Sequence, residues 1–435
     1  MRSQFPLVII GAGPAGAGAA KEAVRCVIDC ALIDQDRIDG DQLGAERTDI
    51  LEHAAVWNIE ANADGGFTIG ILHADRSRDI HADHLIIANG AYAREVPFLG
   101  WHLPGVEAAV AKPSIPTGGE GIVLAGSGPT LFANALSYLR AGADVRALLD
   151  TRPTNRLDAI IEQARSSPEK DYLDAQNAMV DEVRSSGVSV YAGVSELQAS
   201  GDASCQAIAF THAGQRQSIE ARSLVLDNGL VPDTRMAQVA GCELAWSASQ
   251  QCWHPILDSY CRNVQSGAFV AGAAAGIVDA RVAELQGELC TLAVAGLIGA
   301  ISTGEHSSRL SRVQESLSKR VGMQSFHDAL YQSPIDVSNL DDATIVCRCE
   351  SVTAGEIRAA ARLGCPGVNQ VKAFTRCGMG PCQGRDCGLI AAALIAQVRG
   401  ESIESAGYFR ARPPLVPINL GQLADCVDPH NCTFP

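Results

Sequence analysis

The chain is predicted to adopt an α/β fold with two dinucleotide-binding units of the Rossmann type and a small helical module rich in cysteine. A short apolar run, a glycine turn and a small-residue helix follow one another at residues 7–25, and the same order returns at residues 121–141. Six of the 15 cysteines fall within residues 347–387, which make up less than a tenth of the chain. Abundant glycine, at 42 residues, and few aromatic residues, at 5%, also suit the tight turns and close packing of nucleotide-binding folds.

The composition excludes several classes of protein. The 435 residues suggest about three domains, and with 47% hydrophobic and 19% charged residues they can bury a large core. A net charge of −15 does not attract phosphate backbones, so we expect no nucleic-acid binding. No apolar run reaches the ~18–20 residues of a membrane-spanning helix. The opening residues MRSQFPLVII show no cleavable secretory signal, so we expect reduced thiols and a cytoplasmic location.

The expected elements follow from hydrophobic runs and turn residues. Strands are expected at residues 7–10, 27–33, 84–89, 122–125, 144–149, 222–226 and 268–271. Helices are expected at residues 15–25, 276–301, 353–363 and 388–398. Thr353 and Glu356 have the spacing of a capping box at the start of the third of these helices.

The same pattern suggests a division into five segments. We expect a first dinucleotide-binding unit at 1–97 and 222–302, a second at 98–221, a connector at 303–340, a cysteine module at 341–400 and an extended, proline-rich tail at 401–435.

The first candidate site is the glycine turn GAGPAG after the first strand. Gly11 permits the tight turn, Gly13 lets the backbone approach a pyrophosphate, and Gly16 lets the helix pack closely on the strand. The free N–H groups at the start of the helix then face the phosphates. Asp34 ends the next strand, where an acid binds a ribose hydroxyl. The alternative is a packing turn without a ligand.

A weaker copy of this site follows the strand at residues 122–125. Gly126 and Gly128 stand in the turn AGSGPT, but Leu131 takes the third glycine position, so this helix cannot approach its strand as closely. Asp150 ends the following strand and is placed to contact a ribose. The sequence leaves open whether this unit binds a nucleotide or only keeps the fold.

The third candidate site consists of thiolates at the spacing of a metal centre. Cys347 and Cys349 form one close pair, and Cys382 and Cys387 form another. Such soft ligands suit zinc or an iron–sulfur cluster, and the C-x-C pair favours iron–sulfur because zinc pairs are more often C-x2–4-C. Cys377 is either a substitute ligand or a buried thiol.

These residues carry a family resemblance. VCRCESVTAGEIRAAARLG and TRCGMGPCQGRDCG resemble the [2Fe–2S] module of bacterioferritin-associated ferredoxins. The order of GAGPAG, GWHLPGV, GSGPT, the cysteine module and RARPPLVPINLGQLA resembles α subunits of soluble opine oxidases, together with heteromeric proline or hydroxyproline dehydrogenases and the flavoprotein subunit of hydrogen cyanide synthase.

The resemblance implies two dinucleotide-binding domains of the flavoprotein reductase type, FAD and a [2Fe–2S] cluster. The FAD site would comprise Gly11, Gly13, Pro14, Ala15, Gly16, Asp34, Gln42 and Gly272. The cluster would lie on Cys347, Cys349, Cys382 and Cys387. Ala273 stands where relatives carry an aspartate that bonds the flavin, and the loss of such a bond costs roughly 1.5–3 kcal/mol.

The resemblance also implies a β subunit of the D-amino-acid-oxidase type that oxidises a secondary amine. The chain would relay electrons from that partner to an acceptor. The sequence leaves open whether an FMN lies at the subunit interface and whether a small third subunit exists. Ala273 and shortened loops favour a second hypothesis, a scaffold subunit that keeps only the cluster or a bound nucleotide. A third hypothesis is an NAD(P)H-dependent flavin reductase, against which Leu131 argues.

Overall fold

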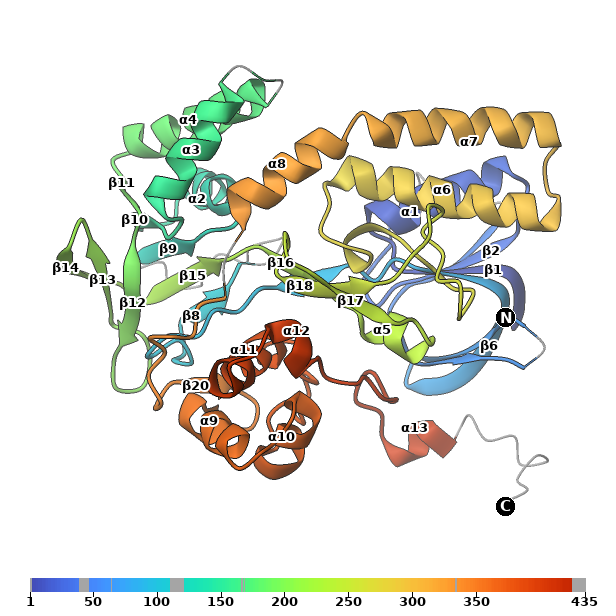
Figure 1. Ribbon diagram of the computed structural model, residues 1–435. Helices are drawn as coiled ribbons and strands as arrows, with labels where there is room; N and C mark the ends of the chain where they lie inside the picture. The colour runs from blue at the N-terminus through green and yellow to red at the C-terminus, as the bar shows by residue number, and fades with distance from the viewer. Residues whose placement is uncertain are drawn as a thin grey trace.

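The computed structural model describes residues 2–38, 47–63, 65–109, 121–165, 167, 169–332 and 335–424. Two α/β units lie side by side, and a helical module packs beneath the strands that connect them (Figure 1). The predicted α/β class with two dinucleotide-binding folds is confirmed.

The first unit is built on a mixed sheet. In spatial order its strands are β3 (Thr48–Leu51), β2 (Cys30–Ile33), β1 (Gln4–Ile10), β6 (Arg76–Ile87), β5 (Phe67–His73) and β4 (Ala54–Ala61), with β19 (Phe269–Val270) also on β6. The central strand β1 is apolar on both faces because both are covered. Leu7 and Ile9 face the helical layer of α1 (Pro14–Arg25) and α6 (Ala280–Ile298), whereas Val8 and Ile10 face the opposite layer.

Helices α1 and α6 pack unusually closely because small residues line their contact. A Cβ added at Gly287 would lie 1.9 Å from the carbonyl oxygen of Ala15, and one at Gly18 would lie 2.4 Å from that of Glu284. The α6 helix begins at Asp279, whose side chain accepts two backbone N–H bonds, and ends at Gly299 in the left-handed conformation.

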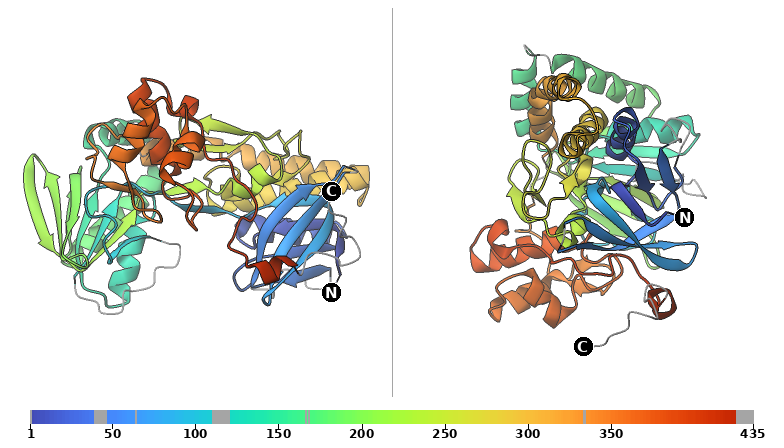
Figure 2. Two further views of the ribbon diagram at one scale, coloured as in Figure 1. Left: turned by 90° about the horizontal axis from the view of Figure 1, so that it is seen from below. Right: turned by 90° about the vertical axis from the view of Figure 1, so that its right-hand side faces the viewer.

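The second unit is built on a parallel sheet. Its strands, in spatial order, are β11 (Ser189–Ala192), β10 (Val145–Asp150), β9 (Ile122–Gly126), β15 (Ser223–Asp227) and β8 (Val106–Ala108). Its helices are α2 (Leu131–Arg140), α3 (Thr154–Ala164) and α4 (Lys170–Ser185). An antiparallel sheet at its outer end comprises β12 (Ser195–Ser200), β13 (Ala207–His212) and β14 (Gln215–Glu220) (Figures 1 and 2).

The strand order of this sheet corrects the predicted boundary at residue 222, between the second unit and the returning part of the first unit. We expected the chain to return to the first unit at residue 222, but β15 pairs along its length with β9 of the second unit. The return therefore lies after Asp227. An apolar strand can complete either sheet, so its composition does not say which one it joins.

Short hairpins and helices complete the junction of the two units. The paired strands are β7 (Ala91–Ala93) with β16 (Leu230–Pro232), and β17 (Leu244–Ser247) with β18 (Cys252–Pro255). The remaining elements here are α5 (Arg235–Val239), the 3-10 helix η2 (Gly272–Ala274), α7 (Thr303–Ser318) and α8 (Val321–Tyr331). The predicted connector thus contains two helices, of which α7 covers the first unit and α8 reaches the second (Figure 1).

The cysteine module is helical, as predicted. It comprises the hairpin β20 (Ile345–Cys347) and β21 (Val352–Thr353) and the helices α9 (Ala354–Arg362), α10 (Val368–Thr375), α11 (Gly388–Arg399) and α12 (Ile403–Ala406). The capping box of Thr353 and Glu356 is present at the start of α9. Residues 403–406 were expected in the extended tail, but they form α12, which packs into the module through Ala406.

The rest of the described tail runs back from the module along the first unit. Leu415 donates its N–H to the carbonyl oxygen of Trp57 in β4, and α13 (Leu420–Ala424) ends the described chain (Figure 2). Among the described residues, no helix combines the length and apolarity needed to cross a bilayer.

Candidate functional site

The first glycine turn has the geometry that its sequence predicts. A Cβ at Gly11 would lie 2.2 Å from the carbonyl oxygen of Ala88, and one at Gly16 would lie 1.7 Å from that of Gly11. These two glycines therefore permit the tight turn and the close helix. At Gly13 an added Cβ meets no atom within 4 Å, and the residue is exposed. The backbone at Gly13 is thus open to a ligand at the N-terminus of α1, where Pro14 occupies the first helical turn.

Asp34 lies beside this turn. Its carboxylate accepts the N–H of Ala12 at 2.6 Å and the N–H of Asp36 at 2.9 Å. These two bonds orient the carboxylate and leave it acceptor capacity for a ribose hydroxyl.

Gly13 and Asp34 line a cavity of about 340 Å³. The segment 376–387 between α10 and α11, which carries Cys377, Cys382 and Cys387, is called the cysteine loop. The cavity extends from the glycine turn to Pro381 and Arg385 of this loop, and the tail residues Leu415 and Pro417 form another wall. The Oδ1 atom of Asn89, another lining residue, is buried and has no hydrogen-bond partner among the described residues.

The remaining predicted flavin contacts fit less well. Gly272 lies close to α1, because its Cβ would fall 2.8 Å from that of Ala15, but its N–H already donates to Oε1 of Gln286. Ala273 lies in the 3-10 helix η2 and brings no polar side chain. Gln42 lies outside the described residues.

The predicted second turn is closed. Gly126 and Gly128 open α2 as expected, but a Cβ at Gly128 would lie 1.8 Å from Oδ1 of Asp227. Asp150, the predicted ribose ligand, is held by Arg152 with a nearest N–O distance of 2.7 Å. Leu131 is buried at the start of α2.

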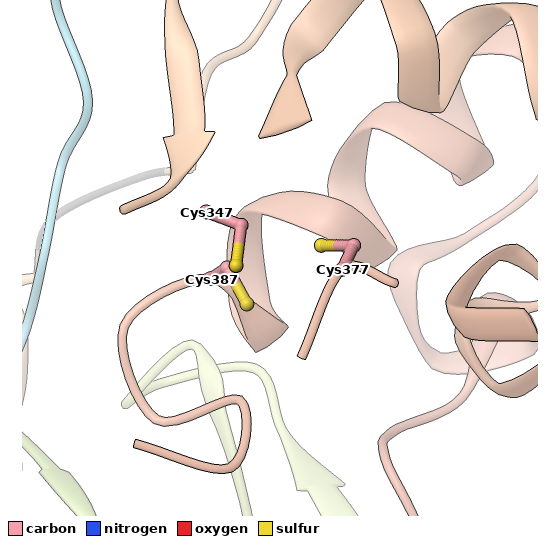
Figure 3. Close-up of side chains that lie close together, drawn as sticks. All are labelled: Cys347, Cys377 and Cys387. Carbon is pink, nitrogen blue, oxygen red and sulfur yellow. The ribbon is translucent and has the colours of Figure 1, made fainter. Parts of the chain in front are cut away.

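The structure brings together the four predicted metal ligands and adds Cys377. The five thiols fall into two groups, and within each group the ligand atoms all lie within 4.8 Å of one another. One group is Cys347, Cys377 and Cys387, whose sulfurs face one another (Figure 3). The other is Cys349 and Cys382, together with Asp386. A single tetrahedral zinc would hold four sulfurs about 3.8 Å apart in one group, so two groups suit a binuclear centre better.

Hydrogen bonds favour the thiolate form inside the first group. Bonds from the Cys377 and Cys387 thiols, and from the N–H groups of Gly378 and Glu350, lower the pKa of Cys347 to about 2 although burial opposes ionisation. The same contact with the Cys347 thiolate raises the pKa of Cys377. A thiolate with N–H donors around it is a preformed metal ligand.

The second group is nearer the surface. Burial raises the pKa of Cys382 to about 11, while the N–H groups of Asp386 and Gly384 favour its thiolate. Cys349 is exposed, whereas Cys347, Cys377 and Cys387 are buried. A centre held here would therefore have one edge toward solvent.

The glycines of the cysteine loop are needed for packing. A Cβ at Gly380 would lie 2.2 Å from that of Cys349. A Cβ at Gly378 or Gly384 would lie 2.6 Å or 2.4 Å from the ring of Phe409. The start of the tail thus closes over the loop that carries Cys382.

Two contacts that sequence reasoning missed fix the module to the rest of the chain. Arg348, between two predicted ligands, lies with its guanidinium 3.8 Å from the ring centroid of the fully buried Trp101. The Tyr92 and Tyr408 hydroxyls lie 2.7 Å apart. The segment GWHLPGV, which contains Trp101, was one of the motifs of the resemblance, but its role in docking depends on a contact between residues far apart in the chain.

The half-buried Glu95 lies beside the cysteine module, in a small cavity that Leu389 and Ile390 also line. Burial raises the pKa of Glu95 to about 7, although Arg348 lowers it, and Asp386 raises it further. Its Oε2 atom is buried without a hydrogen-bond partner among the described residues.

Comparisons with known proteins define the class first. Residues 5–287 match the family described as pyridine nucleotide-disulphide oxidoreductase, and residues 342–426 match the sarcosine oxidase A3 domain. The chain is thus an oxidoreductase of the two-dinucleotide-domain type that carries a cysteine module.

The full-length relatives narrow this class. The chain is 31% identical to the A subunit of opine oxidase from Rhizobium meliloti, over 98% of this chain and 88% of that protein. It is 26% identical to the HcnB subunit of hydrogen cyanide synthase from Pseudomonas aeruginosa, over 94% and 96%. Among solved structures, L-proline dehydrogenase from P. horikoshii shares the fold, with a TM-score of 0.72 and 18% identity over 97% of this chain and 80% of that one. The chain belongs to the family of opine oxidase A subunits, as the sequence motifs indicated.

Proposed function

We propose that this chain is the electron-transfer subunit of a heteromeric amine or opine oxidoreductase. The observation that carries the proposal is the shared cavity, which is lined at one end by Gly13 and Asp34 and at the other by Pro381, the neighbour of Cys382. A nucleotide cofactor at the glycine turn and a metal centre in the cysteine loop would thus lie at two ends of one space. The full-length similarity to a protein named as an oxidase subunit supports the same proposal.

FAD is the cofactor that the first unit fits. Gly11, Gly13, Pro14, Ala15 and Gly16 would hold its diphosphate at the start of α1, and Asp34 would accept a ribose hydroxyl. A bound flavin supplies a carrier for electrons taken from an organic donor. The protein's part is the open backbone at Gly13 and a cavity walled by its own tail.

The cysteine loop fits a [2Fe–2S] cluster. Cys349 and Cys382 would hold one iron, and Cys347 with Cys387 would hold the other. Cys377 is the alternative to Cys387 as the second ligand of this iron, because both lie beside Cys347 (Figure 3). The exposure of Cys349 gives electrons an exit toward an acceptor.

Oxidation of the substrate is assigned to a partner, a β subunit of the D-amino-acid-oxidase type. No histidine is among the described residues that line the shared cavity, so the cavity offers no imidazole base for an amine. We place the complex in the cytoplasm, where thiols such as the thirteen described cysteines stay reduced.

A second cavity, of about 350 Å³, lies on the other side of the cysteine loop. It is lined by the basic residues Arg235, Lys372, Arg376, Arg385, Arg410 and Arg412, whereas Asp233 is its single described acid. Arg235 is paired with Asp233 and Arg376 with Glu350. The other four basic residues leave an excess of positive charge, which suits an anion in a chain of net charge −15. It supports an FMN phosphate at a subunit interface.

Two observations favour the alternative of a scaffold subunit with a decayed FAD site. The N–H of Gly272 is bonded to Gln286, and Ala273 offers no acceptor. In that case the chain would keep the cluster alone, or a nucleotide, for structure.

Co-expression with the product of a neighbouring flavoprotein gene tests the proposal. We expect the two chains to copurify with flavin and iron, and an amine or opine to reduce both cofactors only in the complex. Substrate turnover by this chain alone would overturn the assignment of oxidation to the partner. Flavin absent from the complex, with iron retained, would favour the scaffold.

A further inference from the structure

The two glycine turns share a sequence pattern but differ in the atoms that lie beside their second glycine, Gly13 in the first turn and Gly128 in the second. At Gly13 an added Cβ meets nothing within 4 Å, and the residue is exposed. At Gly128 the Cβ would lie 1.8 Å from Oδ1 of Asp227 and 2.6 Å from the backbone nitrogen of Gly229, and the residue is buried. The space beside the second glycine, which this motif reserves for a pyrophosphate, is therefore taken by the protein itself.

Asp227 is held in that space by its own contacts. Oγ1 of Thr130 donates to Oδ2 of Asp227 at 2.6 Å, and the N–H of Gly229 donates to Oδ1 at 3.1 Å. The N–H of Gly128 donates to the carbonyl oxygen of Asp227 at 2.7 Å. Thr130 is the N-cap of α2, so the carboxyl group lies at the helix N-terminus, where the phosphates of a dinucleotide otherwise bind.

The ribose position is also occupied. Two guanidinium nitrogens of Arg152 donate to the Asp150 carboxylate, at distances from 2.7 to 3.2 Å. The same guanidinium lies 5.4 Å from the ring centroid of Tyr331 in α8, and the Tyr331 hydroxyl is 2.7 Å from that of Tyr172. Asp34 of the first unit, by contrast, accepts backbone N–H groups and lines an open cavity.

One cavity along this edge of the second sheet is acidic. It measures about 580 Å³ and includes Gly126 and Thr151 at the ends of β9 and β10. Its charged lining residues are Glu196, Asp336, Asp341 and Arg216, and the guanidinium of Arg216 already donates to the backbone carbonyl of Glu196 and to the side chain of Gln198. A pyrophosphate would meet net negative charge here.

We propose that the second unit does not bind NADH or NADPH, although it has the fold of a pyridine-nucleotide domain. The Asp227 carboxyl group occupies the anion position, where Thr130 and the N–H of Gly229 hold it. Through these bonds Asp227, where the chain leaves the second unit for the first, is fixed to the turn at the start of α2. The second unit therefore passes no hydride from a pyridine nucleotide to a flavin in the first unit.

Titration of the purified full-length chain with NADH and NADPH, followed by nucleotide fluorescence and calorimetry, tests the inference. We expect no saturable binding up to about 1 mM once Gly13→Ala has blocked the turn of the first unit. We expect Asp227→Ala to bind NADH at least about tenfold more tightly, because it empties the anion position. Binding that survives Gly13→Ala is assigned to the second unit.

Thr130→Val is the matched control, because it removes a donor to the carboxyl group but leaves the group in place. We expect it to bind no nucleotide. Saturable binding of NADH or NADPH to the second unit of the native chain would overturn the inference, even if Asp227→Ala does not fold. A folded Asp227→Ala protein without any gain in affinity would overturn the role of the carboxyl group.

Discussion

Gly13→Ala separates the ligand-binding role of the first glycine turn from its structural role. Gly13 has φ −65° and ψ −173°, a conformation open to alanine, and the new methyl group meets no atom within 4 Å. Replacing glycine by alanine restricts the unfolded chain and so stabilises the folded protein by about 0.4–1 kcal/mol. Alanine is also a poorer N-cap residue than glycine, which costs a similar amount. We therefore expect the free energy of unfolding to change by less than about 0.5 kcal/mol.

The effect on flavin should be much larger. The methyl group would stand between the backbone and the pyrophosphate, and a hydrogen bond to a charged group contributes about 1.5–3 kcal/mol. The affinity for FAD should fall by about 10- to 150-fold. Urea unfolding measures the first quantity, and titration of the apoprotein with FAD, followed by flavin fluorescence, measures the second.

Gly304→Ala is the control for this substitution. Gly304 lies in the first turn of α7, is exposed and has equally open space at its Cβ. It should gain about 0.5–1 kcal/mol of stability and keep its FAD affinity. An unchanged FAD affinity in Gly13→Ala would refute the role of this turn in binding the ligand. A loss of more than about 2 kcal/mol of stability would show that a methyl group at Gly13 does not have open space around it.

Three further predictions concern the module and its surroundings. Cys387→Ser should abolish iron binding, whereas Cys377→Ser should retain it. The reverse result in iron analysis would show that Cys377, and not Cys387, is the ligand. The pKa of Glu95 is about 7 in the folded protein and 4.5 ordinarily, so the native protein loses stability as the pH rises between these values. Glu95→Gln should not show this loss. In urea unfolding it should be about 3 kcal/mol more stable than the native protein at pH 8 but not at pH 4. An equal difference at both pH values would contradict that pKa. Phe409→Ala should cost about 3–5 kcal/mol of unfolding free energy by emptying the space over the cysteine loop, whereas a cost under about 1 kcal/mol would show that the tail does not hold the loop.

Local patterns predicted the parts of the fold that depend on neighbouring residues. The roles of Gly11 and Gly16 follow from the turn itself, and the capping box at Thr353 follows from its own spacing. The pairs Cys347/Cys349 and Cys382/Cys387 were predicted from their spacing along the chain, and the structure places one member of each pair in each of two groups of thiols.

Features that depend on distant residues were not predictable in this way. Asp227 fills the second glycine turn only because β15 joins the second sheet, and the strand sequence does not identify its sheet. Cys377 lies beside Cys347 because the loop after α10 folds back, a contact that the sequence spacing left undecided. Phe409 lies outside every motif, and its role appears only when the tail packs on Gly384.

The central claim is that the cysteine module holds a binuclear iron–sulfur centre. Metal and acid-labile sulfide analysis of the anaerobically purified chain, together with its visible absorption spectrum, tests this claim most directly. The two groups of thiols predict about two iron atoms and two inorganic sulfides per chain, with absorption that bleaches on reduction. One zinc per chain and no sulfide would contradict the claim.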